Sequence, residues 1–303
     1  MKKNISLLLK IFSILVIGFF LFVVLGKSPQ TNNDSAKTND MDVSQVTETT
    51  LVSGPEINLP WDFELEFIKS KEINNTPVLM GAYRTVLKDP LPGEEFNVHL
   101  AARMLCGIVL QPGEIFSQNG TVGPYTEERG FQRGPTYIGS KLTTTIGGGV
   151  CKIASTLYNV CVLSNLNIIE RHNHSMPVPY VPYGQDATVS YGAKDLKFKN
   201  NTEGNIMIWA QGIDNVLYMG FYGIQEPPSI SWNHEVLKKT SAQKIYKINP
   251  SLPKGYEKVL IDGMDGATVK SSLTIEEKDG TIIKKEMGIS NYSPFPTLIE
   301  KGP

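Results

Sequence analysis

The sequence has little net charge and few cysteines. Its 303 residues include 29 lysines and arginines against 30 aspartates and glutamates, which gives a formal net charge of −1 at pH 7. Without an excess of positive charge the chain has no field that gathers a polyanion, so no nucleic acid is expected as a partner. Three cysteines are too few for a disulfide-dense scaffold, and their odd number leaves at least one thiol unpaired within the chain. The chain is long enough to fold around a hydrophobic core without disulfides.

Aromatic residues are absent from one long stretch. Residues 27–60 contain no Phe, Trp, Tyr or Cys and are dominated by Thr, Asn, Asp, Ser and Gln. Such a segment cannot bury enough apolar surface to offset the entropy of ordering it, so we expect a flexible polar linker.

Residues 1–26 have the features of a membrane-targeting segment. Lys2, Lys3 and Lys10 precede an uninterrupted apolar run over residues 11–25, and a membrane span needs about 20 apolar residues. The pattern predicts a signal anchor, with the N-terminus in the cytoplasm and the folded part outside a cell membrane that it crosses once. A cleaved signal peptide, which would leave a secreted protein, is the alternative interpretation.

The rest of the chain divides into two parts by composition. Residues 61–230 contain all the arginines and cysteines, and residues 231–303 contain neither. In the second part, alternating residues on both sides of Asp279 and Gly280 predict a β-hairpin. We therefore expect an α+β fold, in which a small all-β domain over 231–303 follows a mixed central domain over 61–230.

Apolar spacing assigns elements within the central domain. It predicts helices over residues 96–109 and 150–164, the second ending at Asn165 in a left-handed conformation. The shorter β-like stretches are residues 168–172, 187–191 and 205–210. The second helix begins beside Cys151, so we expect a cysteine-bearing helix packed on a β-sheet.

The most informative motif is GGGVC at residues 147–151. Gly147, Gly148 and Gly149 allow a sharp turn and a close approach to a ligand, which makes them candidate binding residues. Cys151 would then occupy the first turn of a helix, where free backbone N–H groups and the helix dipole stabilise a thiolate. The same N–H groups are suited to an oxyanion. The alternative is that Cys151 is a small buried residue, as most cysteines are.

Downstream, the motif ERHNHS at residues 170–175 supplies candidate bases. On a strand, Glu170, His172 and His174 would share one face, and either histidine is a candidate partner for the Cys151 thiolate. Asp186 is a candidate third member that orients the base. The chain order Cys, His, Asp is that of transglutaminase-like thiol enzymes, so a transglutaminase-like arrangement is the analogy we test.

A zinc site is a competing interpretation of the same residues. His172 and His174 on one strand face would both reach a Zn²⁺, with Cys151 or Glu170 as a third ligand. No further cluster of ligand types follows in the sequence, so no cofactor is expected and zinc remains the alternative.

Three more residues have structural and functional interpretations. Arg171 suits a carboxylate of an anionic extracellular polymer, and is otherwise an internal ion-pair partner. Cys106 and Cys161 fall on buried-looking helix positions, and a disulfide between them is compatible with the sequence.

Taken in order, the motifs resemble the VanW family. The matching motifs are NVHLAA (97–102), PGEIFS (112–117), GGGVC (147–151), TLYN (156–159), ERHNHS (170–175), YVP (180–182), GQDATV (184–189) and DLKFKN (195–200). They extend from about residue 87 to 223, nearly half of the chain. One departure is Lys152, because family members commonly have Gln after the motif cysteine, which puts in doubt an oxyanion role for that side chain.

The resemblance implies a cell-envelope protein of Gram-positive type, from a family named for an accessory protein of vancomycin-resistance clusters. Combined with the residues, it favours a thiol-dependent hydrolase or transferase that acts on peptide or amide bonds of the cell wall. The first alternative is a non-catalytic module that binds peptidoglycan or an envelope protein. The second is a zinc-dependent hydrolase that uses His172 and His174.

Overall fold

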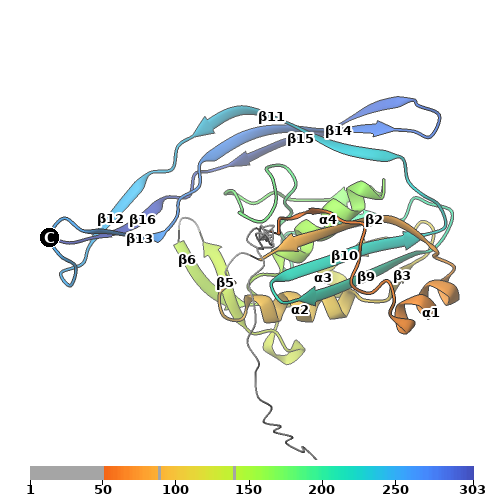
Figure 1. The fold of residues 1–303 in the computed structure, drawn as a ribbon, viewed down its shortest axis with the longest axis horizontal. Coiled ribbons are helices and arrows are strands. Elements are labelled where there is room, and N and C mark those ends of the chain that lie inside the picture. Colours follow the sequence, from red (N-terminus) through yellow and green to blue (C-terminus); the bar gives the residue numbers. More distant parts are fainter. Residues whose placement is uncertain (1–50, 88–89, 139–140) are drawn as a thin grey trace, which may run out of the picture. The chain divides into compact units, whose positions relative to one another are not determined.

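A five-stranded antiparallel sheet forms the centre of the protein (Figure 1). The computed structural model describes residues 51–87, 90–138 and 141–303, so the expected signal anchor and the expected linker up to residue 50 lie outside the described residues. The end of the expected linker is corrected: Gly54 and Pro55 pair with a strand of the central sheet, and Leu59 is 5% exposed, so this stretch is part of the fold. None of the described helices is long and apolar enough to cross a membrane. Across the sheet the strands are β1 (Gly54–Pro55), β2 (Val78–Val86), β10 (Val216–Gly223), β9 (Ile206–Ile213) and β3 (Ile108–Leu110).

Both faces of this sheet are covered, because successive side chains of a strand point to opposite sides. On one face lie α2 (Glu94–Leu105) and α4 (Cys151–Leu163), whose apolar side chains share the main core with Ile206 and Ile208 of β9. Met207 and Trp209, which alternate with these isoleucines along β9, point to the other face, where they meet Phe67 of α1 (Leu65–Asn74). The helix that begins at Cys151 therefore packs on the central sheet, against β2 and β10.

Smaller elements surround α4. Their bounds are β4 (Ile115–Ser117), α3 (Gln118–Thr121), a 3-10 turn (Glu127–Arg129), β5 (Arg133–Ile138), β6 (Lys141–Ile146), β7 (Asn167–Glu170) and β8 (Lys197–Lys199). Strands β5 and β6 form a hairpin, and β4, β8 and β7 form a three-stranded sheet. The chain from β6 runs directly into α4, and β7 follows that helix.

The C-terminal part, which we call the β module (residues 229–303), contains two further three-stranded sheets. In the first, β11 (Ser229–Thr240), β14 (Gly266–Glu276) and β15 (Ile282–Tyr292) run as a long antiparallel ribbon (Figure 1). The second consists of β12 (Lys244–Ile248), β16 (Thr297–Lys301) and β13 (Glu257–Ile261). The hairpin expected around Asp279 and Gly280 is the β14–β15 pair, with Gly280 at φ +84°.

Two helix predictions meet different outcomes. The helix expected over 150–164 is α4, and Asn165 adopts the expected left-handed conformation at φ +55°. The helix expected over 96–109 ends at Leu105, which corrects that prediction. Gly107 takes φ +80° and turns the chain into β3, where Ile108 pairs with Ile208 and packs on the same core. The apolar residues keep a helix-like spacing from α2 into β3, so the spacing alone did not reveal where the helix ends.

Two strand predictions need correction, while that over 205–210 corresponds to β9. The strand expected over 168–172 ends at Glu170, where the register shifts, so the two histidines beyond it do not extend a strand face. Residues 187–191 form no strand. The Ala187 N–H donates to the Ser155 hydroxyl at 3.0 Å and the Thr188 N–H to the His172 carbonyl at 2.8 Å, so these groups are satisfied outside a ladder.

The β module shares the main core with the central part. Leu273 and Ile275 of β14 are 3% and 5% exposed and belong to the same buried cluster as the side chains of α4. Trp232 of β11 adds a ring contact with Tyr158 of α4, with centroids 5.8 Å apart. These contacts couple the folding of the two parts.

Replacing Leu273 with Ala tests this coupling. We expect the free energy of unfolding to fall by about 2–5 kcal/mol, because a buried leucine is lost from a packed core. Leu260→Ala is the control: this leucine is 41% exposed on β13, so its removal should change stability by no more than about 0.5 kcal/mol. Urea unfolding followed by circular dichroism measures both variants. A loss below about 1 kcal/mol for Leu273→Ala would contradict burial in a shared core.

Candidate functional site

Cys151 is placed by a tightly packed glycine turn between β6 and α4. Gly149 has φ +102°, a conformation that side chains with a Cβ rarely adopt. A Cβ on Gly148 would lie 2.2 Å from the backbone of Gly134, so only glycine allows the two segments to come this close. The side chain of Asn97 locks the turn by donating to the Gly148 carbonyl at 2.9 Å. The glycines thus build the entry to α4, and Cys151 is the first residue of the helix.

The structure brings Cys151, His174 and Asp186 together. The imidazole of His174 lies close enough to the Cys151 thiol to influence its ionisation through hydrogen bonding and charge. On the other side of the imidazole, Nδ1 lies 2.7 Å from Oδ2 of Asp186. Because Asp186 occupies Nδ1, Nε2 is the ring nitrogen left for the thiol. Cys151 Sγ also lies 3.4 Å from the Thr188 hydroxyl.

Burial, hydrogen bonds and neighbouring charges shift the pKa values of Cys151 and His174. Burial raises the pKa of the Cys151 thiol, but the hydrogen bond and charge of His174, with Thr188 and the Val189 backbone, bring the pKa down to about 7. Burial likewise lowers the pKa of His174, but Asp186 and Cys151 outweigh it and raise the pKa to about 9. Between pH about 7 and about 9, thiolate and imidazolium therefore coexist as an ion pair.

Asp186 is held in place by four donors. Its side chain is 1% exposed. The backbone N–H of His174 donates to Oδ2 at 2.7 Å, in addition to the imidazole contact. Arg171 Nη2 donates to Oδ1 at 3.1 Å, and the Tyr292 hydroxyl donates to the same oxygen at 2.5 Å. Burial raises the pKa of Asp186, but His174 and Arg171 prevail and keep it below its ordinary value.

Arg171 faces inward, which supports its interpretation as an internal ion-pair partner. Besides Asp186, it donates to the backbone carbonyls of Asp186 and Gly184 and, through Nη1, to the Ser290 hydroxyl at 3.0 Å. With 13% of its side chain exposed, it offers little surface to a polymer carboxylate. Its partner is Asp186 and not the adjacent Glu170.

Glu170 and His172 form a separate group. His172 Nε2 lies 3.0 Å from Oε1 of Glu170, and Lys197 donates to Oε2 at 2.8 Å. Hydrogen bonds from Lys197 and His172 lower the pKa of Glu170 to about 2. Since β7 ends at Glu170, the expected alignment of both histidines on one strand face does not occur. Of the two histidines, His174 interacts with the thiol and His172 contacts Glu170.

Lys152, the residue after the cysteine, forms an ion pair with Glu94 at the start of α2. Its ammonium also lies 4.8 Å from the ring centroid of Tyr180. The side chain is thereby held between α2 and the segment that follows β7.

The other two thiols differ from Cys151. All three cysteines are free, so the disulfide between Cys106 and Cys161 is not formed. Burial raises the pKa of the Cys161 thiol well above its ordinary value and also raises that of Cys106. Cys106 is the residue that follows α2 and packs on the opposite face of the central sheet, not on a helix face as expected. Among the three, only Cys151 has a pKa near neutrality.

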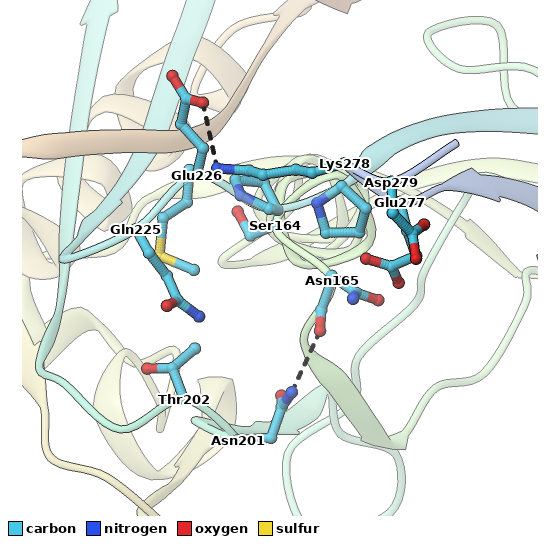
Figure 2. A pocket seen from close by; sticks show the side chains of 12 residues that line it. Ser164, Asn165, Asn201, Thr202, Gln225, Glu226, Glu277, Lys278 and Asp279 are labelled. Atoms are coloured by element: carbon cyan, nitrogen blue, oxygen red, sulfur yellow. Dashed lines mark hydrogen bonds and ion pairs between the residues drawn. The ribbon is translucent and has the colours of Figure 1, made fainter. Parts of the chain in front are cut away.

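Among the described residues, neither a cluster of metal ligands nor the hollow drawn in Figure 2 coincides with the Cys151 site. Within the described ranges, no group of three His, Cys, Asp or Glu side chains is arranged to hold a metal ion. A hollow of about 560 Å³ lies beyond the opposite end of α4 (Figure 2). Its lining consists of Met80, Ser164, Asn165, Asn201, Thr202, Gln225, Glu226, Pro227, Pro228, Glu277, Lys278 and Asp279. It is therefore separate from the Cys151 site.

Comparison with known proteins places this region in a family. The family model described as "VanW like protein" matches residues 93–222. This segment matches the VanW family model, and we refer to it below as the VanW domain. It contains Cys151, His174, Asp186 and Arg171, whereas Tyr292 lies outside it.

Two relatives support the assignment. The chain is 34% identical over 143 residues to the uncharacterized protein YoaR of Bacillus subtilis, covering 47% of each chain. It is 34% identical over 140 residues to the vancomycin B-type resistance protein VanW of Enterococcus faecalis, covering 45% of this chain and 51% of the relative. The chain thus spans about half the length of the curated relatives it matches.

Among solved structures, the chain is similar to two small domains. The IgA1 protease G5 domain is 22% identical and matches 26% of this chain and 95% of its own, with a TM-score of 0.17. The HP0197-G5 structure is 16% identical and matches 24% of this chain and 99% of its own, with a TM-score of 0.15. Likenesses of this size carry no functional conclusion.

Sequence reasoning missed Tyr292 and Thr188 as neighbours of the VanW-domain site. Thr188 lies in the GQDATV motif, two residues after Asp186. This short separation in the sequence indicated that Thr188 could lie near the site. Tyr292 is separated from Asp186 by 106 residues and lies on strand β15 of the β module. No spacing rule connects them.

The two histidines of the VanW domain can be separated by substitution. In His174→Gln the thiol loses its charged partner while burial remains, so we expect the pKa of Cys151 to rise from about 7 past the ordinary thiol value of 9.0. In His172→Gln it should not move, because His172 contacts Glu170. The pH dependence of iodoacetamide labelling at Cys151, with Cys106 as internal reference, measures both. An equal rise in the two variants would contradict the assignment of His174 as the partner.

Proposed function

We propose that the VanW domain is a thiol-dependent hydrolase or transferase acting on peptide or amide bonds of the cell wall. The observation that carries this proposal is the series Cys151, His174 and Asp186, in which a thiol with a pKa of about 7 faces an imidazole with a pKa of about 9. A nucleophile, a base and a group that orients the base, all within hydrogen-bond reach, are the parts that covalent acyl transfer requires. Their chain order is that of transglutaminase-like thiol enzymes, which is an analogy of arrangement.

The groups present are sufficient for both halves of an acyl transfer. The Cys151 thiolate attacks the amide carbonyl carbon and forms a C–S bond, and the carbonyl π electrons move to oxygen. When the intermediate collapses, the C–N bond breaks and the imidazolium of His174 gives its proton to the leaving amine. Water or a second amine then attacks the thioester, His174 takes its proton, and the C–S bond breaks to restore the thiolate.

The start of α4 offers donors for the oxyanion. The backbone N–H groups of Cys151 and Ile153 have no hydrogen-bond acceptor among the described residues, and the positive end of the helix dipole adds to their effect. The side chain of Lys152 is held by Glu94. The backbone therefore takes the oxyanion role, and the exchange of the family glutamine for Lys152 is compatible with it.

A cell-wall substrate is supported by the Enterococcus faecalis relative, which is named a vancomycin B-type resistance protein. We carry this envelope context to the present chain as part of the proposal. Peptidoglycan, through its peptide or amide bonds, is then the polymer on which Cys151 acts.

Incubation with muropeptides tests the reaction. We expect the full chain to release a product that has gained water, or an amine-exchanged product, and mass spectrometry to find an acyl group on Cys151. Cys151→Ala should lower the rate by at least about 10³-fold, as loss of a nucleophile does. Cys106→Ala is the matched control and should retain the rate, because Cys106 packs on the other face of the sheet. Full turnover by Cys151→Ala would refute the proposal.

A second candidate function is non-catalytic binding of peptidoglycan through the β module. It is favoured by exposed apolar side chains on β12 and β13 and on the loop between them, among which Tyr246 and Tyr256 are 48% and 54% exposed. Contiguous apolar residues on a surface mark interaction sites. A binding module would yield no product from muropeptides with any variant. Cosedimentation with sacculi and complementation in cells complete the distinction, because a binding module would retain both in Cys151→Ala.

We further propose that residues 1–26 anchor the protein in the cytoplasmic membrane, with residues 27–50 as a tether to the extracellular folded part. The support is the lysine-flanked apolar run over residues 11–25. If the anchor is uncleaved, the cellular protein retains the full mass of 33.5 kDa and sediments with membranes after carbonate extraction. A shorter protein in the culture supernatant would instead indicate a cleaved signal peptide.

A further inference from the structure

The β module contacts Asp186, the residue that holds His174 in the VanW-domain site. Tyr292, the last residue of β15, is 5% exposed, and its hydroxyl donates to Asp186 Oδ1 at 2.5 Å. Asp186 holds the imidazole of His174 through its other oxygen. Tyr292 is thus two hydrogen bonds away from the ring that contacts Cys151.

The Tyr292 hydroxyl is fixed on both sides. Its oxygen accepts the backbone N–H of Gly184 at 2.8 Å, which directs the hydroxyl proton to Asp186. Burial raises the pKa of Tyr292 above its ordinary value, so this hydroxyl stays protonated and remains a donor wherever the thiolate exists. Unlike a surface hydroxyl, it has a single orientation that satisfies both neighbours.

A second residue of β15 acts on the same carboxylate through Arg171. Ser290 is two positions before Tyr292, so both side chains lie on one face of the strand. The Ser290 hydroxyl accepts from Arg171 Nη1, and Arg171 Nη2 donates to Asp186 Oδ1. Strand β15 therefore holds Asp186 once directly and once through the guanidinium.

Further contacts fix the β module beside the Asp186 segment. Gln185, adjacent to Asp186, places its amide nitrogen 3.0 Å from Nε2 of His234 on β11. His234 Nδ1 in turn lies 3.0 Å from the Ser271 hydroxyl of β14. All three strands of the ribbon therefore take part in positioning the segment that carries the carboxylate.

We infer that Tyr292 is a positioning residue for the Cys151–His174–Asp186 site, so that the β module completes a site whose reacting groups all belong to the VanW domain. The inference deepens the proposed function and rests on it for its catalytic meaning. Tyr292 touches neither the thiol nor any substrate. Its effect passes through the orientation of Asp186, which decides whether His174 is held against Cys151.

Tyr292→Phe removes the hydroxyl and keeps the ring. Asp186 then loses a donor and becomes freer to turn away from His174, so the imidazolium that stabilises the thiolate is weakened. We expect the midpoint of iodoacetamide labelling at Cys151 to move to higher pH and labelling at pH 7 to slow about threefold. The NMR titration midpoint of His174 should fall in parallel.

Tyr183→Phe is the matched control. Its ring lies 5.3 Å from that of Tyr292, but its hydroxyl donates to the Asp265 carbonyl and not to Asp186. Labelling should match that of the unaltered chain. If Tyr292→Phe and Tyr183→Phe are both folded by circular dichroism and label alike across pH, the inference is overturned.

A third variant covers the case in which Tyr292→Phe does not fold. Ser290→Ala removes the hydrogen-bond acceptor of Arg171 Nη1. Labelling of Cys151 at pH 7 should then slow in the same direction as in Tyr292→Phe, by about twofold. An unchanged labelling rate in Ser290→Ala would decide against the inference. Labelling needs no substrate, so it separates the two proposals. A shifted labelling profile without any muropeptide product supports the role of Tyr292 and refutes the enzymatic function, and turnover with an unshifted profile does the reverse.

Discussion

The arrangement around Cys151 depends on one buried carboxylate. Removing Asp186 from water costs several kcal/mol unless donors replace the lost hydration. The protein supplies four, from the backbone and ring of His174, from Arg171 and from Tyr292. These donors belong to separate segments. The hydrogen bonds to one carboxylate therefore fix the relative positions of the loop that carries Asp186, the segment that follows β7 and strand β15.

The same carboxylate explains why three thiols in one chain behave differently. Burial alone raises a thiol pKa, as it does for Cys161 and Cys106. Cys151 is also shielded from water, but it faces an imidazole that Asp186 keeps protonated, and in a low-dielectric setting that charge outweighs the burial cost. The low pKa at this position is therefore a property of the neighbours and not of the helix start alone.

Sequence patterns predicted the local features and missed the distant ones. Glycines before a helix, the alternation around Gly280 and the candidates Cys151, His174 and Asp186 are all encoded within short windows, and the structure contains each of these features. The choice between His172 and His174 was not encoded, because β7 ends at Glu170 and the chain then bends toward Asp186. Tyr292 was out of reach for a different reason, since only tertiary packing brings β15 to this carboxylate.

The contribution of β15 has a consequence for the order in which the molecule is made. The ribosome produces the cysteine, the histidine and the aspartate more than 100 residues before Tyr292, because 106 residues separate Asp186 from this tyrosine. Until that strand is synthesised and docked, Asp186 lacks its Tyr292 donor and Arg171 lacks Ser290. A polypeptide that ends before β15 thus carries the thiol without the full set of contacts around it, although its VanW domain is unchanged.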